Sequence, residues 1–212
     1  MNSDKIILKN PIVLATRNRG KISEFKEILE NFDIDIKGLN EFFPIPPVEE
    51  DGKTFEENAV KKACYTSRIL GLPAIADDSG LSVEALGGLP GVFSARYAGR
   101  QATDLENNIK LLDAMKGVEN RAAAFECIIA IAVPKGLSLI YAGRCEGLIT
   151  NELTGGKGFG YDPIFYYVPG KKTFAQMTLE EKNKVSHRGR AMLRLKSEFG
   201  NILKWLNENL NE

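Results

Sequence analysis

The sequence contains little histidine, tryptophan or cysteine, and it has no excess of charge of either sign. It has one histidine, one tryptophan and three cysteines in 212 residues, and 28 basic side chains balance 28 acidic ones. A balanced chain creates no long-range field that would attract nucleic acid or an anionic membrane. We therefore expect neither as a partner, and we expect any anionic ligand to be bound by a local site.

The three cysteines, Cys64, Cys127 and Cys145, are odd in number and far apart, without the spacing of a metal site. They are typical of buried thiols in a reducing compartment. No apolar run has the length of a membrane-spanning helix, and the charged Asp4 and Lys5 argue against a signal peptide. Together these features predict a cytoplasmic protein.

Several common catalytic and binding motifs are missing as well. No Gly-x-Ser-x-Gly motif is present, and no serine or cysteine forms a nucleophile motif with His187, the single histidine. The first glycine of a Walker phosphate-binding loop is also missing. We therefore do not expect nucleophilic triad chemistry, and a phosphate site would have to be of another kind.

Short apolar runs alternate with capped helices along the chain, which predicts a single α/β domain over residues 1–212. Strands are predicted at 12–15, 33–39, 73–76, 122–133 and 137–150, and helices follow residues 21, 54, 103, 178 and 190. The run 122–133 is the longest and is expected to be a central strand that turns at 135–136 and returns as a hairpin. A mixed sheet is therefore expected.

Two adjacent carboxylates, Asp77 and Asp78, follow the apolar run 73–76. Ligands bind at the carboxyl ends of strands in α/β sheets, and a divalent metal would offset the repulsion between two close acids. Ser79 and Gly80 come next, and the glycine permits a sharp turn. The alternative is an Asx turn in which either aspartate only caps the backbone.

Residues 16–21 connect the first predicted strand to the first helix. The free N–H groups and the dipole at a helix N-terminus favour an anion, and Thr16, Asn18 and Lys21 add a hydroxyl, an amide and a cation. This pattern is compatible with a phosphate site. The alternative is a capped helix whose basic residues are merely exposed.

Residues 155–163 form a second cluster of interest, in which four glycines surround Lys157, Phe159 and Tyr161. Such a loop permits close approach to a ligand and offers a ring for stacking.

Residues 49–51 are three consecutive acids, which form either a solvated turn or part of a metal site. Lys182, His187 and Arg188 supply cations and hydrogen-bond donors late in the chain.

Six segments, in this order, resemble the inosine triphosphate pyrophosphatase family over nearly the whole chain. They are Thr-Arg-Asn-Arg-Gly-Lys at 16–21, Thr-Phe-Glu-Glu-Asn-Ala at 54–59, Ile-Ala-Asp-Asp-Ser-Gly-Leu at 75–81, Pro-Gly-Val-Phe-Ser-Ala-Arg-Tyr at 90–97, Gly-Phe-Gly-Tyr-Asp-Pro at 158–163 and Ser-His-Arg at 186–188. A small departure is Arg19, where many members have proline or lysine. The combination of all six is far more specific than any one of them.

The resemblance implies an elongated α/β fold with a long, twisted, mixed sheet flanked by helices, two lobes with a central cleft, and a homodimer. It implies hydrolysis of non-standard purine nucleoside triphosphates (ITP, dITP and XTP) to the monophosphate and pyrophosphate. This reaction would keep the abnormal bases out of DNA and RNA.

The resemblance also implies roles for individual residues. Thr16, Arg17, Asn18, Arg19, Gly20 and Lys21 would hold the triphosphate. Asp78 would be the general base and, with Glu49, a ligand of Mg²⁺. Ser79 would contact the substrate, Phe159, Gly160, Tyr161 and Asp162 would form the base pocket, and Lys182, His187 and Arg188 would reach the purine.

Two alternatives remain open at this stage. A related phosphohydrolase with the same fold could act on modified or pyrimidine triphosphates, and turnover of inosine against thymidine triphosphate separates the two. A nucleotide-binding module without catalysis is the other alternative. Such a module would not need Asp77, Asp78 and Glu49, so the acidic residues argue against it.

Overall fold

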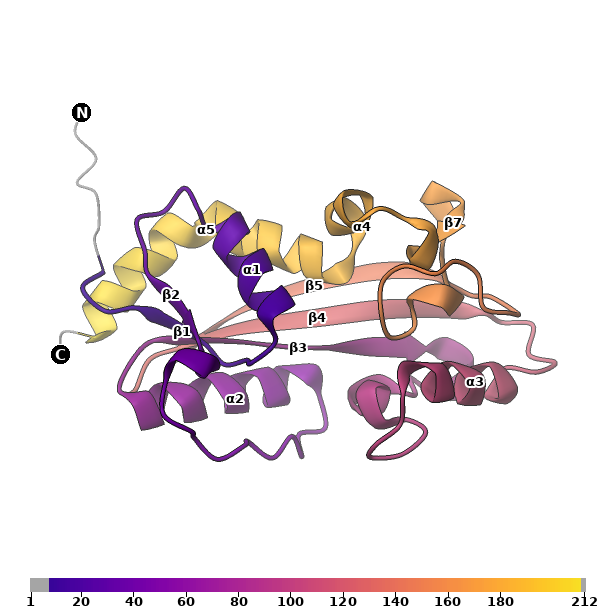
Figure 1. The fold of residues 1–212 in the computed structure, drawn as a ribbon, viewed down its shortest axis with the longest axis horizontal. Helices are drawn as coiled ribbons and strands as arrows, with labels where there is room; N and C mark the ends of the chain where they lie inside the picture. The colour runs from indigo at the N-terminus through magenta and orange to yellow at the C-terminus, as the bar shows by residue number, and fades with distance from the viewer. Residues whose placement is uncertain (1–7, 211–212) are drawn as a thin grey trace. The chain divides into compact units, whose positions relative to one another are not determined.

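The computed structural model describes residues 8–210, which form a mixed α/β structure (Figure 1). The helices are α1 (Arg19–Ile28), α2 (Phe55–Leu70), α3 (Asp104–Ala114), α4 (Leu179–Val185) and α5 (His187–Leu210). The strands are β1 (Ile12–Leu14), β2 (Ile36–Gly38), β3 (Ala74–Val83), β4 (Ala122–Ala132), β5 (Ser138–Ile149), β6 (Phe165–Tyr167) and β7 (Lys172–Thr173). A search of these residues finds no helix that could cross a membrane.

Within the described range, the strands make one sheet of seven in the order β2-β1-β3-β4-β5-β6-β7. β1 runs parallel to β2 and β3, whereas β5, β6 and β7 pair antiparallel, so the predicted mixed sheet is confirmed. β4 is the middle strand, as its long apolar run predicted. The Val133 N–H donates to the Leu137 carbonyl at the turn between β4 and β5, and the Ile149 N–H donates to the Arg121 carbonyl at their other ends. This reversed pairing confirms the predicted hairpin.

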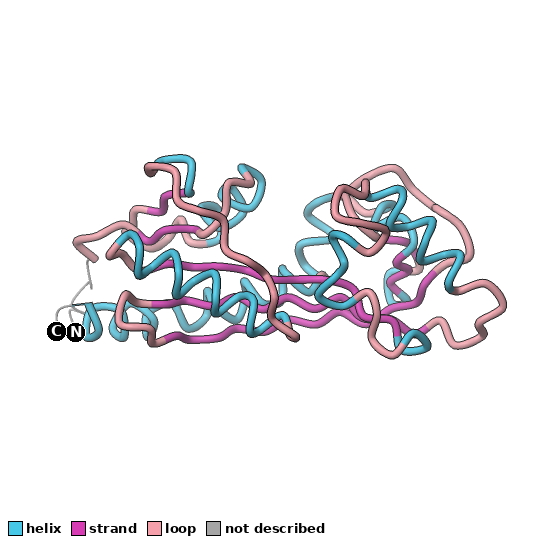
Figure 2. Tube along the Cα trace, turned by 90° about the horizontal axis from the view of Figure 1, so that it is seen from below, coloured by secondary structure: helices cyan, strands magenta, loops and turns pink. Residues whose placement is uncertain are grey.

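The chain divides into two compact units. Of the described residues, the first unit comprises 8–78, 128–142 and 191–210, and the second comprises 79–127 and 143–190. The boundary in β3 falls between the consecutive residues Asp78 and Ser79. In each unit, helices and loops cover the strands (Figure 2).

In the first unit, α2 covers one face of the strands, while α1 and the later turns of α5 cover the other (Figure 1). The ends of α2 follow from local chemistry. The Thr54 hydroxyl accepts the Glu57 N–H at 3.1 Å, and Gly71 ends the helix in the left-handed region at φ 65°. Ala59 and Ala63 pack against alanines of β3 and β4, and these small side chains let α2 approach the sheet closely.

The core of the second unit is built around three phenylalanines. The ring centroid of Phe125 in β4 lies 4.7 Å from that of Phe165 and 5.8 Å from that of Phe174. Leu81, Val83 and other apolar residues complete this core. Contacts of this kind between rings stabilise a core beyond the burial of their area.

The strand that carries the two aspartates is longer than predicted. β3 continues to Val83, because Leu81 and Val83 are fully buried and maintain the alternation of a strand. Asp77 and Asp78 therefore lie inside the strand, so their predicted position at its carboxyl end is wrong, and so is the alternative of an Asx turn. Consecutive strand residues point to opposite faces, which sends the two carboxylates to different helices.

Candidate functional site

The loop before α1 is organised by its own side chains. Asn18 is the N-cap of α1, and its side-chain oxygen accepts the N–H groups of Gly20 at 2.9 Å and Lys21 at 3.3 Å. The Thr16 hydroxyl accepts the Asn18 N–H at 3.1 Å. Thr16 and Asn18 thus shape the loop, and the capped helix that was the alternative is present. The cap occupies two of the N–H groups that an anion would otherwise use.

Lys21 and Arg17 tie this loop to neighbouring segments of the first unit. The Lys21 ammonium lies 2.8 Å from both carboxylate oxygens of Asp77, which is 7% exposed. The Arg17 guanidinium donates to the Ile45 carbonyl at 3.4 Å, and the Arg17 carbonyl accepts the Asn40 side-chain amide at 3.1 Å. Arg19 and Gly20, the other predicted phosphate contacts, are exposed at the start of α1.

Asp78 points to the other side of the strand and meets α2. The Lys62 ammonium lies 2.8 Å from the Asp78 carboxylate and 3.5 Å from that of Glu50. The side chains of Lys62 and Asp78 are only 15% and 12% exposed. Two carboxylates therefore converge on one ammonium group in a largely desolvated place.

Burial and the neighbouring charges together set the pKa values of Asp78 and Lys62. Burial raises the pKa of Asp78, and Glu50 adds to that rise; the attraction of Lys62 offsets only part of it, so the pKa lies above its usual value of 3.8. Burial would lower the pKa of Lys62, but Asp78 and Glu50 outweigh it, so this pKa lies above 10.5. A carboxylate with a raised pKa is typical of a general base.

Glu50 and Lys62 are site residues that the sequence did not single out. Of the two adjacent glutamates, Glu50 contacts Lys62 and acts on Asp78, whereas Glu49 is exposed. The metal-binding role of Glu49 stays a prediction. One signal was available, because Asn58 and Lys62 are polar residues four positions apart on an otherwise packed helix face.

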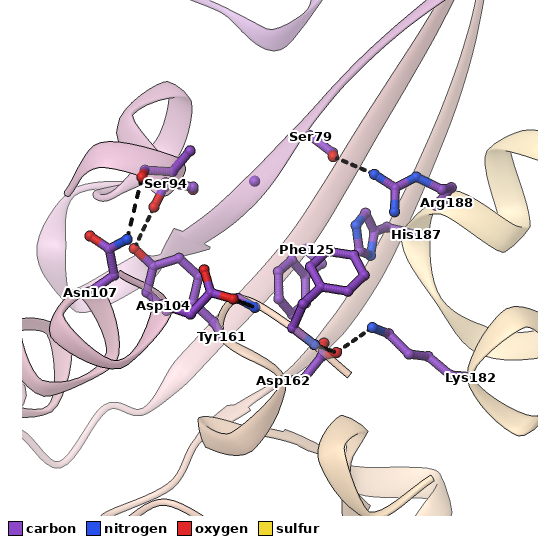
Figure 3. A pocket seen from close by; sticks show the side chains of 14 residues that line it. Ser79, Ser94, Asp104, Asn107, Phe125, Tyr161, Asp162, Lys182, His187 and Arg188 are labelled. Atoms are coloured by element: carbon purple, nitrogen blue, oxygen red, sulfur yellow. Dashed lines mark hydrogen bonds and ion pairs between the residues drawn. The ribbon is translucent and has the colours of Figure 1, made fainter. Parts of the chain in front are cut away.

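In the second unit, a cavity of about 150 Å³ brings together eight of the residues predicted to bind substrate (Figure 3). These are Ser79, Phe159, Gly160, Tyr161, Asp162, Lys182, His187 and Arg188. The cavity is also lined by polar and aromatic residues that sequence reasoning missed, namely Ser94, Asp104, Asn107 and Phe125. The second unit thus contains a pocket lined by aromatic rings and by several hydrogen-bond donors.

One side of the pocket is an aromatic ring held beside an ion pair. Lys182 pairs with the Asp162 carboxylate, and its ammonium lies 4.5 Å from the centre of the Phe159 ring. Asp162 also accepts the Phe159 N–H at 2.9 Å. Gly158 permits this arrangement, since a Cβ there would lie 2.0 Å from the Asp162 carboxylate oxygen. Phe159 is 60% exposed, and its ring offers a surface for stacking.

The first turn of α5 also lines the pocket, and the Arg188 guanidinium lies 6.0 Å from the centre of the Phe159 ring. The His187 ring stacks on Phe125, with centroids 4.6 Å apart and planes at 10°, and the residue is 7% exposed. Arg188 donates to the Ser79 hydroxyl at 3.2 Å. Tyr161 is structural by comparison, since its hydroxyl donates to the Ser94 carbonyl at 2.8 Å and burial raises its pKa.

The chain and its fold have counterparts among known proteins. The chain belongs to the Ham1 family, whose model matches residues 12–198. It is 60% identical to the dITP/XTP pyrophosphatase of Syntrophobacter fumaroxidans over 92% of this chain and 84% of that protein. It is 57% identical to the dITP/XTP pyrophosphatase of Desulfotalea psychrophila, over 95% of this chain and 90% of that protein.

Solved structures agree with this assignment. The HAM1 protein from Coxiella burnetii superposes with a TM-score of 0.87 at 43% identity, over 91% of this chain and 99% of that one. The Staphylococcus aureus Ham1 protein gives a TM-score of 0.85 at 41% identity, over 91% and 99%. The resemblance inferred from the six sequence segments is confirmed, and so is the α/β fold class with its mixed sheet and flanking helices.

Proposed function

We propose that the protein is a nucleoside triphosphate pyrophosphatase that hydrolyses non-standard purine nucleoside triphosphates such as ITP, dITP and XTP. The products are the nucleoside monophosphate and pyrophosphate, and the reaction cleanses the nucleotide pool of bases that would otherwise enter DNA and RNA. The observation that carries this proposal is the half-buried Asp78, whose pKa is raised beside Lys62, in a chain closely similar to dITP/XTP pyrophosphatases.

Asp78 acts as the general base in this proposal. Its carboxylate takes a proton from a water molecule while the water oxygen forms a bond to phosphorus. The bond between the bridging oxygen and that phosphorus breaks, and the bridging oxygen leaves with the other fragment. Lys62 opposes the rise in the pKa of Asp78 and fixes the direction of its carboxylate through the 2.8 Å contact. General base catalysis of this kind contributes about 10²–10⁴-fold to a rate.

The carboxylates of Asp78 and Glu50 suit a magnesium ion shared with substrate. Both converge on the position of the Lys62 ammonium, so the local field attracts a cation. Among residues 8–210, no cluster of three or more acidic, histidine or cysteine side chains could hold a metal by itself. Magnesium commonly takes one or two carboxylates together with phosphate oxygens and water. When bound, it would offset the negative charge that develops on the phosphate oxygens.

We expect Glu50→Gln to weaken magnesium binding by roughly 10-fold or more, the loss typical of a disturbed metal site. Glu49→Gln, one residue away, is the matched control and should bind the ion as the unmodified protein does. Titration calorimetry with Mg²⁺ and a non-hydrolysable ITP analogue would measure both. If only Glu49→Gln weakens magnesium binding, Glu49 is the metal ligand, as predicted from the sequence.

The remaining site residues divide between the phosphates and the base. Lys21 supplies a point charge for the triphosphate from the start of α1. Phe159 stacks on the purine, and Lys182, His187 and Arg188 donate to acceptors on the ring. A pocket built to satisfy a keto oxygen disfavours adenine, whose amino group leaves those donors unpaired.

Product analysis tests the bond that is broken. We expect pyrophosphate and a monophosphate as direct products from ITP, because the proposed reaction cleaves between the α- and β-phosphates. Phosphorus NMR of a reaction without added pyrophosphatase would show this. Orthophosphate and a diphosphate as the first products would contradict the proposal. Faster turnover of thymidine triphosphate than of inosine triphosphate would instead support a phosphohydrolase that acts on pyrimidine triphosphates.

The homodimer and the cytoplasmic location implied above remain part of the proposal.

A further inference from the structure

Two side chains near the start of α3 form hydrogen bonds with the backbone N–H and carbonyl of Gly160, in the loop of residues 158–162. The Asp104 carboxylate accepts the Gly160 N–H at 2.6 Å, and the Asn108 side-chain amide donates to the Gly160 carbonyl at 2.8 Å. Asp104 and Asn108 are four residues apart, so they lie on the same face of the helix. The same amide of Asn108 also donates to the Asp104 carbonyl at 2.6 Å, which links the two residues.

Gly160 lies between Phe159 and Tyr161 and controls the path of the loop. Its φ of 59° and the 77° of Gly158 place both glycines in the left-handed region, where the backbone needs external contacts to hold one path. Phe159 is 60% exposed, and the contacts on its ring include the Lys182 ammonium at 4.5 Å and the Arg188 guanidinium at 6.0 Å from its centre. Its orientation therefore depends on these two cations and on the backbone of residues 158–162.

The two side chains are not needed to start α3. Thr103 and Glu106 form a capping box, in which the Thr103 hydroxyl accepts the Glu106 N–H at 3.2 Å and Glu106 accepts the Thr103 N–H at 2.7 Å. Asn108 is 2% exposed and does not line the cavity, although the cavity wall includes Gly160. An effect of Asn108 on the bound base would therefore have to pass through the loop.

We propose that Asp104 and Asn108 are positioning residues that fix the backbone at Gly160 so that Phe159 presents its ring to the purine. This inference rests on the proposed function. It predicts that the two residues affect base binding more than the chemical step. Asp104 also lines the cavity, whereas Asn108 reaches it only through Gly160, so Asn108 isolates the effect of the loop.

The test compares Asp104→Ala, Asp104→Asn and Asn108→Ala in steady-state kinetics with ITP. Loss of one hydrogen bond should raise KM by about 3- to 10-fold, with kcat changed by less than about 2-fold. Asp104→Asn keeps an acceptor for the Gly160 N–H and should restore most of the loss seen in Asp104→Ala. Asp113→Ala removes an exposed carboxylate from the last turn of α3, whose partner is Lys116, and should leave KM unchanged.

A double-mutant cycle shows whether the effect passes through the ring. In a Phe159→Ala background, Asn108→Ala should no longer raise KM, because the surface that it positions is gone. An unchanged KM in Asp104→Ala, or a full effect of Asn108→Ala without the ring, would overturn the inference. If Asn108→Ala does not fold, the pair Asp104→Ala and Asp104→Asn decides alone.

Hydrogen exchange provides a readout that does not depend on activity. Peptides covering 158–162 should exchange faster in Asp104→Ala, and the rate should recover in Asp104→Asn. An unmodified protein that does not hydrolyse ITP would contradict the proposed function, whereas unchanged exchange in Asp104→Ala would contradict the positioning role. The two failures are thus distinguishable.

Discussion

Replacing Asp78 with asparagine is expected to lower kcat for ITP by about 10²–10⁴-fold, the usual contribution of a general base. Asparagine has nearly the same size, but it neither accepts the proton from water at neutral pH nor attracts a cation. Initial rates of pyrophosphate release would measure the loss. Activity within a few-fold of the unmodified protein would remove Asp78 from the chemical step.

The same substitution should leave the protein folded. The pKa of Asp78 is raised, so its contribution to stability is fully present below pH 3.8 and is lost as pH rises through the folded value. At neutral pH the carboxylate therefore lowers the free energy of unfolding, and asparagine removes this loss. Lys62 has the opposite effect on stability. Its pKa is raised by the nearby carboxylates, so its charged form stabilises the folded protein below pH 10.5, and this stabilisation is lost only as the pH rises through the folded pKa. Asp78→Asn removes one of these carboxylates and weakens the stabilisation. Because the two changes oppose each other, we expect a small shift in Tm by calorimetry.

Asp77→Asn is the matched comparison, because it changes the adjacent residue in the same strand. Asp77 binds the Lys21 ammonium through both oxygens, so its loss should disturb the phosphate contact and raise KM more than it lowers kcat. Equal loss of kcat in the two variants would show that the division of roles between the aspartates is wrong.

His187→Ala is expected to narrow the preference for ITP over adenosine triphosphate by about 10- to 100-fold. A buried donor lost to a neutral acceptor costs roughly 1–3 kcal/mol, which corresponds to that range. The loss should fall on ITP, whose keto oxygen accepts the bond. Ratios of kcat/KM for the two substrates would measure the change.

Because His187 stacks on Phe125, alanine removes packing as well as a donor. His187→Phe retains a flat ring against Phe125 and removes only the donor, so it is the control. Loss of selectivity in both variants would assign the effect to the donor. If both variants slow the two substrates equally, His187 does not read the base.

The arrangement around β3 shows how the charges of two adjacent aspartates are offset. The alternation of the strand separates the two carboxylates, and each meets one lysine, Lys21 for Asp77 and Lys62 for Asp78. Repulsion between the acids was the reason to expect a metal from the sequence. In the structure an ammonium group lies beside each carboxylate and offsets this repulsion, so the magnesium ion that we propose would bind the phosphates rather than hold the fold.

Local signals in the sequence determined the helices and much of the sheet. Thr54 and Gly71 are the cap residues of α2, and the capping boxes at Thr103 and Thr178 start α3 and α4 as predicted. Such caps depend on hydrogen bonds within a few residues, so they can be recognised in a single sequence. The resemblance based on the six segments is confirmed by the match to the Ham1 family, and it named eight residues that line the pocket of the second unit.

Only the tertiary structure decided which of these residues meet. The order of the strands and the packing of helices on them brought Glu50 and Lys62 to Asp78, and Asp104 and Asn108 to Gly160. These pairs are separated by up to 56 residues, and nothing in the spacing of the chain indicates them. The length of β3 was decided in the same way, because buried contacts of Leu81 and Val83 extend the strand beyond the aspartates and override the turn that Asp-Asp-Ser-Gly locally favours.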